Sequence, residues 1–293
     1  MSRSRDDHTV GEVLGQIVRR AAAEVEDTAA AALADEPDGV HQHRVRVRRL
    51  RSVLGGFREV LDTRSAERLR VAYAEWGREL GVVRDIEVRA DVAEQLMERA
   101  ELDDPAIVQR LVDSEREAYP TAHERLVELA RSPRAQERAR LLREFAGTPG
   151  VVEPDRPAAD VLAKVLAKQA RRVEKAEDRL DGSDEAHHDL RKAARRTRYV
   201  AEAIGGVAAD LFPEQVEAIA DAGDDLHDAL GAHRDAMLLA HRVAHEGALA
   251  GRAGELSDAY ETIADLLRAD AEERLQEVPS ALRKLKAAAS RLP

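Results

Sequence analysis

The sequence predicts an all-α protein made of two related helical bundles. Ala, Leu, Arg and Glu dominate the 293 residues, and all four are strong helix formers. Apolar residues recur at helical spacing, as in Leu126, Leu129 and Ala130, and the alternating β-branched residues typical of strands are absent. Three motifs also recur in the same order in the two halves of the chain, which indicates an internal duplication.

Proline and glycine predict where the helices begin and end. Pro37 and Gly39 precede the first strongly basic segment, and Asp104 followed by Pro105 is typical of an N-cap and a first helical residue. The clearest linker is 147–157, with three prolines and two glycines, close to the middle of the chain. Further helix starts are expected at Pro133, Pro213 and Pro279.

The repeated motifs divide the chain at that linker. The pattern H-x-x-R-x-x-x-R-R-x-R begins at His41 and again at His188, and the pattern L-G-x-x-R-D begins at Leu80 and again at Leu230. A third and weaker match pairs 13–33 with 161–180. We therefore expect one bundle over 1–150 and a second over 151–293, related by a pseudo-dyad and together forming one domain.

The charge of the protein is sorted along the chain. The formal net charge is −11, from 46 Lys and Arg against 57 Asp and Glu. Residues 40–51 carry +5 and residues 186–198 carry +4, so the remaining residues carry −20. Two short basic segments in an acidic protein are not a random distribution of charge.

Each basic segment is expected to form a helix with an apolar face and a narrow basic stripe beside it, at about 100° per residue. The first stripe consists of His41, Arg44, Arg48 and Arg51, beside Val47, Leu50, Leu54, Phe57 and Leu61. The second consists of His188, Arg191, Arg195 and Arg198, with Lys192 and Tyr199 at its edge, beside Leu190, Ala194, Ala201 and Ile204. Arg49 and Arg196 are expected to point away from the core into solvent.

The stripes favour an anionic ligand. Two like charges 4 Å apart repel by about 4 kcal/mol at an effective dielectric constant of 20, so folding alone does not call for arginine at every turn. The guanidinium fork fits phosphate oxygens bidentately, and a linear array of forks suits a linear array of phosphates. The alternative is that both stripes are solvated, or are neutralised by acidic residues of neighbouring helices.

Composition excludes several other classes. The chain has no cysteine, so thiol catalysis and Cys-ligated metals are excluded. Apolar runs of about 18 residues and an apolar signal region are lacking, which predicts a cytoplasmic protein without membrane attachment. Only 3% of the residues are aromatic and the net charge is negative, which argues against specific nucleic-acid binding.

Enzymatic and metal-binding alternatives have weaker support. His233, His241 and His245 share a helical face and could contribute metal ligands, but the chain has neither the H-E-x-x-H pattern nor a phosphate-binding glycine loop. His41 or His188 beside arginine could also serve a phosphohistidine mechanism, which would need an acid or metal partner that the sequence does not identify. No cofactor is predicted.

At this point the motifs resemble a known family. VHQHRVRVRRLR, ELGVVRDIEV, HDLRKAARRTRYVAE and LHDALGAHRDAM are similar, in order and spacing, to four characteristic segments of the CHAD family, the conserved-histidine α-helical domain. The resemblance covers roughly residues 10–290. It implies two four-helix bundles, a basic groove or pore between them that binds inorganic polyphosphate, and association with polyphosphate granules in the cytoplasm. Many relatives also carry a CYTH triphosphatase domain, for which this chain has no room.

The resemblance also assigns residues outside the stripes. Arg84, and in the second half His233 and Arg234, occupy the corresponding leucine-glycine motif, although Arg234 replaces an uncharged residue common in relatives. Asp85 and Asp235 are interpreted either as carboxylates that orient Arg or His, or as helix N-caps. The basic C-terminal segment adds Arg283, Lys284 and Lys286, which could instead complement the dipole of a surface helix.

The sequence therefore predicts a non-enzymatic protein that binds inorganic polyphosphate along two Arg- and His-lined helices. The alternative is a phosphohistidine or metal-dependent enzyme acting on polyphosphate or nucleotide phosphates. The sequence names no protein partner.

Overall fold

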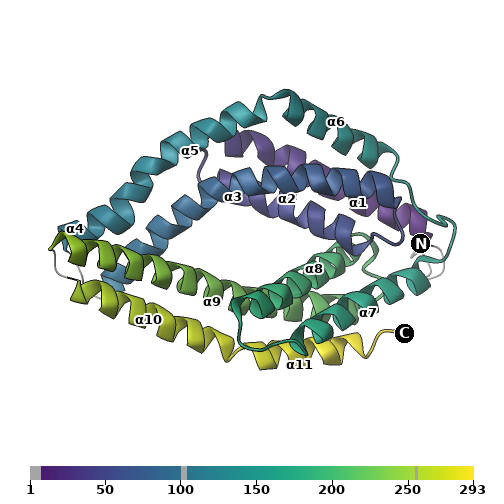
Figure 1. Ribbon diagram of the computed structural model, residues 1–293. Helices are drawn as coiled ribbons and strands as arrows, with labels where there is room; N and C mark the ends of the chain where they lie inside the picture. Colours follow the sequence, from purple (N-terminus) through teal and green to yellow (C-terminus); the bar gives the residue numbers. More distant parts are fainter. Residues whose placement is uncertain (1–7, 100–103, 255–256) are drawn as a thin grey trace.

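The computed structural model describes residues 8–99, 104–254 and 257–293, and helices account for nearly all of these segments (Figure 1). Within the described residues, the β-type pairings are two isolated bridges, Thr9–Pro157 and Leu61–Val151, so the all-α prediction is confirmed. The first half contains α1 (Val10–Leu33), α2 (Gly39–Gly56), α3 (Thr63–Arg99), α4 (Pro105–Val108), the π-helix η1 (Gln109–Asp113), α5 (Ser114–Ala130) and α6 (Pro133–Gly147). The second half contains α7 (Ala158–Glu177), α8 (Asp184–Ala208), α9 (Pro213–Ala253), α10 (Asp258–Leu275) and α11 (Val278–Ala289).

The helix starts and the linker predicted from proline and glycine lie at helix ends in the structure. The Asp104 carboxylate accepts a hydrogen bond from the Ala106 amide at 2.8 Å, and Pro105 is the first residue of α4. Pro133 and Pro213 likewise begin α6 and α9, and residues 148–157 connect α6 to α7. Pro279 is the second residue of α11.

The first basic helix is shorter than its apolar periodicity suggests. α2 ends at Gly56, and the backbone N–H of Phe57 closes it by donating to the carbonyl of Val53. Phe57 and Leu61 are nevertheless fully buried, the latter in one of the two isolated bridges. Their side chains reach the core from the turn that follows α2 rather than from a continuation of the helix.

Apolar contacts join the two halves in two places. The main core contains α1 and α2 residues such as Val18 and Leu54 together with α7 and α8 residues such as Leu162 and Ile204. A second cluster joins the end of α3 and η1 to α9 and α10, and a third packs α11 against α7, α8 and α9. This arrangement places α2 beside α8 (Figure 1).

A buried carboxylate strengthens the second junction. Glu115 of α5 has only 4% of its side chain exposed. It accepts two hydrogen bonds from Arg89 of α3, at 3.0 and 2.8 Å, and forms an ion pair with Arg242 of α9 at 2.5 Å. One charge thus links three helices from both halves of the chain.

Membrane insertion has no support from the helices. None of those in the described part of the chain combines the length and hydropathy needed to cross a bilayer.

Candidate functional site

The first stripe lies on α2 and includes arginines with unsatisfied hydrogen-bonding capacity. Arg44 forms an ion pair with Asp85 of α3 at 3.2 Å. The Nε atoms of Arg48 and Arg51 are buried and donate to no described residue. Because a buried donor without an acceptor is costly, these two side chains add little to the stability of the free protein; outside the stripes, Nε of Arg242 is also buried without an acceptor among the described residues.

The second stripe, on α8, has the same character. The Nε atoms of Arg191 and Arg195 are also buried without an acceptor among the described residues. Arg198 is satisfied, because it pairs with Glu202 at 2.6 Å and with Asp224. Tyr199 is buried, and its ring centroid lies 5.4 Å from the Arg198 guanidinium carbon.

The two stripes converge. Burial lowers the pKa of Arg48, and the charges of Arg44, Arg191 and Arg198 lower it further. Burial likewise lowers the pKa of Arg195 to about 9, with Arg48 and Arg191 contributing. Residues from both halves therefore repel one another across the α2–α8 contact, and the site concentrates positive charge.

The leucine-glycine motifs explain how these arginines find room. An ideal Cβ at Gly81 would lie 3.5 Å from Nη2 of Arg44, and one at Gly231 would lie 3.1 Å from Nη2 of Arg191. Each motif glycine thus lies against the first arginine of the stripe in its own half. A larger side chain at either position would compete with the guanidinium for space.

One of the two interpretations of Asp85 and Asp235 is wrong. Both residues lie well inside the continuous helices α3 and α9, so neither is an N-cap. The strong helix formers on both sides of the glycine carry the helix through it, so no helix begins at either aspartate. Asp85 instead pairs with Arg44, and the charge of Asp235 partly offsets the lowered pKa of Arg191, as expected for carboxylates behind the arginines.

The two stripe histidines lie among cations. Burial lowers the pKa of His41, and Arg84 contributes to the shift. Burial and then Lys192, Arg234 and Arg191 lower the pKa of His188. Both imidazoles are therefore neutral at pH 7 in the free protein.

Arg234 determines which nitrogen of His188 carries the proton. Its Nη1 lies 3.0 Å from Nδ1 of His188, and because arginine only donates, Nδ1 accepts and the neutral ring holds its hydrogen on Nε2. His188, Arg191 and Arg234 line a cavity of about 360 Å³. His233 also lines it, but its Nδ1 is within 3.1 Å of the Ala271 carbonyl and its ring lies edge-on to His187.

The other predicted site residues have different surroundings. Arg84 forms an ion pair with Glu87 at 2.7 Å, and Lys192 pairs with Asp189 at 2.9 Å on the flank of α8. The three C-terminal candidates are exposed on α11. Lys284 pairs with Asp225 and Lys286 pairs with Glu177, both at 2.7 Å, while Arg283 lies on the same exposed face.

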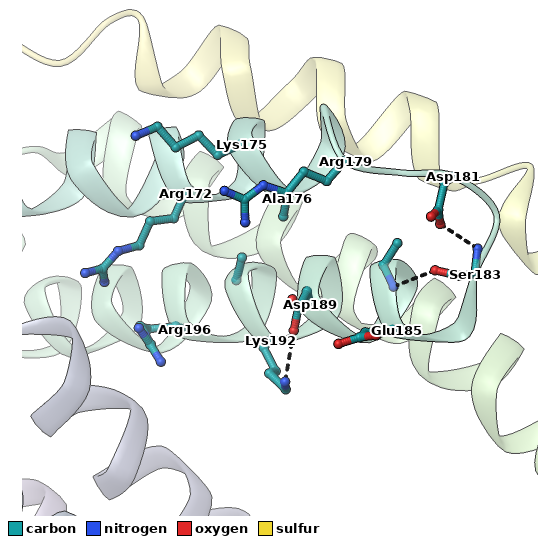
Figure 2. A pocket seen from close by; sticks show the side chains of 12 residues that line it. Arg172, Lys175, Ala176, Arg179, Asp181, Ser183, Glu185, Asp189, Lys192 and Arg196 are labelled. Atoms are coloured by element: carbon teal, nitrogen blue, oxygen red, sulfur yellow. Dashed lines mark hydrogen bonds and ion pairs between the residues drawn. The ribbon is translucent and has the colours of Figure 1, made fainter.

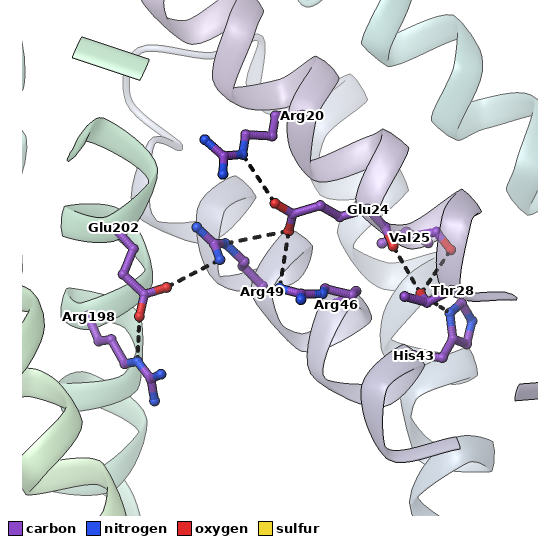
Figure 3. A network of polar contacts seen from close by, with 9 residues as sticks. All are labelled: Arg20, Glu24, Val25, Thr28, His43, Arg46, Arg49, Arg198 and Glu202. Atoms are coloured by element: carbon purple, nitrogen blue, oxygen red, sulfur yellow. Dashed lines mark hydrogen bonds and ion pairs between the residues drawn. The ribbon is translucent and has the colours of Figure 1, made fainter. Parts of the chain in front are cut away.

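Arg49, which was expected to be solvated, takes part in an ion-pair network that joins α1, α2 and α8. It lies 3.8 Å from Glu24 and 3.4 Å from Glu202, and Arg46 also reaches Glu24 at 3.6 Å (Figure 3). The carboxylates in this region are therefore directed to Arg49 and Arg198 rather than to the arginines with unpaired Nε atoms.

Sequence reasoning missed His227 of α9. It is 8% exposed, its Nδ1 lies 3.2 Å from Asp228, and its Nε2 is buried without a described partner. Burial lowers its pKa to about 4, and Arg191, Arg195 and Arg48 contribute. The signals in the sequence were its place one helical turn before Gly231 and its position in the segment LHDALGAHRDAM, from which no role was assigned to it.

A possible metal-ligand group differs from the predicted histidine series. Ligand atoms of Asp224, His227 and Asp228 lie within 4.8 Å of one another. Arg198 and the hydrogen bond between His227 and Asp228 already balance these carboxylates.

Comparison with known proteins agrees with this geometry. The sequence pattern of the CHAD domain matches residues 16–244, which include both stripes and both leucine-glycine motifs. Two uncharacterized proteins of Mycobacterium tuberculosis, from strains CDC 1551 / Oshkosh and H37Rv, are each 30% identical over 261 residues. The alignment covers 86% of this chain and 49% of each relative, so the chain spans about half the length of the curated relatives it matches.

Two solved structures share the fold. The structure of PptA from Streptomyces chartreusis aligns with a TM-score of 0.70 and 21% identity, over 97% of this chain and 100% of that one. The CHAD domain from the plant Ricinus communis aligns with a TM-score of 0.68 and 21% identity, over 98% and 94% of the two chains. Because the CHAD pattern matches residues 16–244, well over half of the sequence, the chain belongs to the CHAD domain family.

Proposed function

We propose that the protein binds inorganic polyphosphate along the two arginine stripes. The observation that carries the proposal is the set of four buried Nε atoms, on Arg48, Arg51, Arg191 and Arg195, that have no acceptor among the described residues. A chain of phosphates supplies acceptors for the accessible N–H groups of these four half-buried side chains, and its charge offsets the mutual repulsion that lowers the arginine pKa values.

The geometry favours a linear polyanion over a single phosphate ion. The four arginines come from two helices in different halves of the chain. The charge of Arg191 lowers the pKa of Arg48, and the charge of Arg48 lowers the pKa of Arg195, so the arginines of the two helices lie close enough to repel one another. One orthophosphate satisfies one or two guanidinium groups, whereas a polymer engages all of them at once and gains from multivalency.

The histidines contribute differently to binding. His188 can donate its Nε2 hydrogen to a phosphate oxygen while neutral, because Arg234 occupies its Nδ1. His41 has no such restriction, and a bound anion would raise its lowered pKa and favour its protonation. Polyphosphate binding should therefore take up protons near neutral pH.

We further propose that binding occurs without turnover, since the same H-x-x-R pattern is present in both halves as a repeated binding surface. Association with cytoplasmic polyphosphate granules follows from the same proposal. A fluorescent fusion should colocalise with granules, and the purified protein should release no orthophosphate from polyphosphate.

The deciding experiment is calorimetry with long-chain polyphosphate, orthophosphate and duplex DNA over a series of salt concentrations. We expect polyphosphate to bind tightly and with strong salt dependence, and the other two weakly. Arg44→Ala and Arg191→Ala should each weaken polyphosphate binding by tenfold or more while the helical circular-dichroism signal stays unchanged. Equal binding of DNA, or phosphate release, would overturn the proposal.

A further inference from the structure

A second basic surface lies on the flank of α8, outside the two stripes. A cavity of about 550 Å³ separates α7 from α8 (Figure 2). Arg172 and Arg196 point toward each other at one end, and Asp181, Ser183 and Glu185 lie at the other. The cavity is therefore polarised, with an arginine end and an acidic end.

The acidic end is satisfied internally. Asp181 accepts the backbone N–H of Ser183 at 2.9 Å, and the Ser183 hydroxyl caps α8 by accepting from Ala186. Asp189, between the two ends, pairs with Lys192 at 2.9 Å. These groups need no further partner.

The arginine end lacks an equivalent balance. Arg196 is half-buried against the end of α2, where an ideal Cβ at Gly55 would lie 3.7 Å from its guanidinium carbon. Burial lowers the pKa of Arg196, and the charges of Arg172, Arg70 and Arg58 lower it further. We call these four residues, Arg58, Arg70, Arg172 and Arg196, the outer arginine cluster.

The partners at its edge leave the cluster positively charged. Arg70 pairs with Glu67, and Arg172 donates to the side-chain oxygen of Gln169 at 2.9 Å. Glu59, the other nearby carboxylate, is paired with Lys168, and the charges of Arg172 and Arg58 also help to lower its pKa, so two carboxylates face four arginines. No ion pair involves Arg196 and a described acidic residue.

Arg49, which occupies the same motif position in the first half, has the carboxylate partners that Arg196 lacks among the described residues. Arg49 precedes Arg196 by 147 residues in the repeated motif, and it has two carboxylate partners, Glu24 and Glu202 (Figure 3). The same motif position is thus neutralised in one half and surrounded by cations in the other. That difference is what an additional anion site in the second half would require.

The outer arginine cluster continues the charge of the stripes. The charge of Arg51 contributes to the lowered pKa of Arg195, and the charge of Arg70 lowers the pKa of both Arg51 and Arg196. Positive charge therefore extends from Arg195 through Arg51 and Arg70 to Arg196, from the stripes to the cavity.

We propose that the outer arginine cluster is a second anion site, which holds phosphate groups of the same polyphosphate chain where it leaves the stripes. The identity of the ligand rests on the function proposed above. Short chains would occupy the stripes alone, and long chains would engage both surfaces.

The test compares polyphosphate of two chain lengths, and it compares the loss of Arg172 with the loss of its neighbour in α7, Arg171. The single variants Arg172→Met and Arg196→Met each remove one arginine of the outer arginine cluster. The control variant Arg171→Met removes an exposed arginine that does not line the cavity. Calorimetry with tripolyphosphate and with long-chain polyphosphate is done on each variant, with melting temperatures as the check on folding. We expect long-chain affinity to fall about tenfold in the two cluster variants only, with tripolyphosphate affinity unchanged in all three.

The outcomes separate this inference from the function on which it rests. Wild-type long-chain affinity in Arg196→Met, or an equal loss for both chain lengths, overturns the second site and leaves binding at the stripes standing. If wild type binds neither probe, the proposed function itself fails. Arg196→Lys retains the charge and should recover most of the long-chain affinity, which distinguishes lost charge from lost packing.

Discussion

The indole N–H of Trp76 donates a hydrogen bond to Nε2 of His43 at 2.9 Å, and both side chains are buried between α2 and α3. Nδ1 of His43 is 2.9 Å from the hydroxyl of Thr28, so both ring nitrogens are occupied in the neutral imidazole. Burial lowers the pKa of His43 to about 4, and the nearby charge of Arg138 contributes. His43 is therefore a structural histidine, two positions from the stripe residue His41.

Acid should destabilise the fold through this contact. The folded-state pKa of about 4 lies below the unfolded value of 6.5, so the unfolded chain binds more protons between these limits and stability falls as the pH falls from about 6.5 to about 4. The slope is about 1.4 kcal/mol per pH unit for each such histidine. Urea unfolding at pH 7, 6 and 5 should show a shallower dependence in His43→Gln, and an unchanged slope would contradict the assignment.

Removing one buried stripe charge should stabilise the free protein while weakening binding. Arg195 is desolvated and repelled by its neighbours, and its Nε has no described acceptor. We expect Arg195→Met to raise the melting temperature by about 2–4 °C, as a gain of about 1 kcal/mol would do, and to reduce polyphosphate affinity. Arg49→Met is the control, because it breaks two ion pairs and should lower the melting temperature.

The motif glycines should respond unequally to substitution. Gly81→Ala adds a methyl group at an ordinary contact distance from Arg44, and it should stabilise α3 by about 0.5–1 kcal/mol with binding retained. Gly231→Leu fills the space next to Arg191, and it should reduce polyphosphate affinity about tenfold with the helical content unchanged. Calorimetry and thermal melts check both, and equal affinities in the two variants would argue against a role for glycine in placing arginine.

The buried carboxylate of Glu115 should be critical for stability. Glu115→Gln leaves the guanidinium groups of Arg89 and Arg242 without their shared counter-charge, at a cost of about 3–5 kcal/mol in the free energy of unfolding. Glu94→Gln, which breaks the exposed pair with Arg116, should cost about 0–1 kcal/mol. Urea titrations of both proteins test the contrast, which would vanish if the Glu115 cluster were solvated in solution.

The sequence was sufficient for the helical class, the linker and the helix starts at proline, because local propensity and capping determine them. It also placed the stripe arginines together on one face of α2 and of α8, since their spacing fixes that face. It could not show that Glu24 and Glu202 neutralise Arg49 while Arg196 faces other arginines. Those partners come from helices distant in sequence, and a helical wheel gives an angle but not the neighbour at that angle.

The same limit explains the other differences. The sequence offered Lys284 and Lys286 as candidate binding residues, yet each forms an ion pair with an acidic residue of another helix. His227 drew no prediction, although tertiary packing buries it among the stripe arginines. The N-cap interpretation of Asp235 was wrong because Gly231 lies inside the 41-residue helix α9, where its lack of a side chain leaves the space that Arg191 occupies.

The contacts of Gly81 with Arg44 and of Gly231 with Arg191 bear on how the two halves of the chain could diverge. A position packed against an arginine accepts only side chains that leave room for the guanidinium group. The space beside Gly231, where an ideal Cβ would lie 3.1 Å from Nη2 of Arg191, is tighter than the space beside Gly81, where the distance to Nη2 of Arg44 is 3.5 Å, so the second half tolerates less change at this position. Each half therefore keeps an arginine and a glycine in contact although their separation in sequence differs, 37 residues from Arg44 to Gly81 and 40 residues from Arg191 to Gly231.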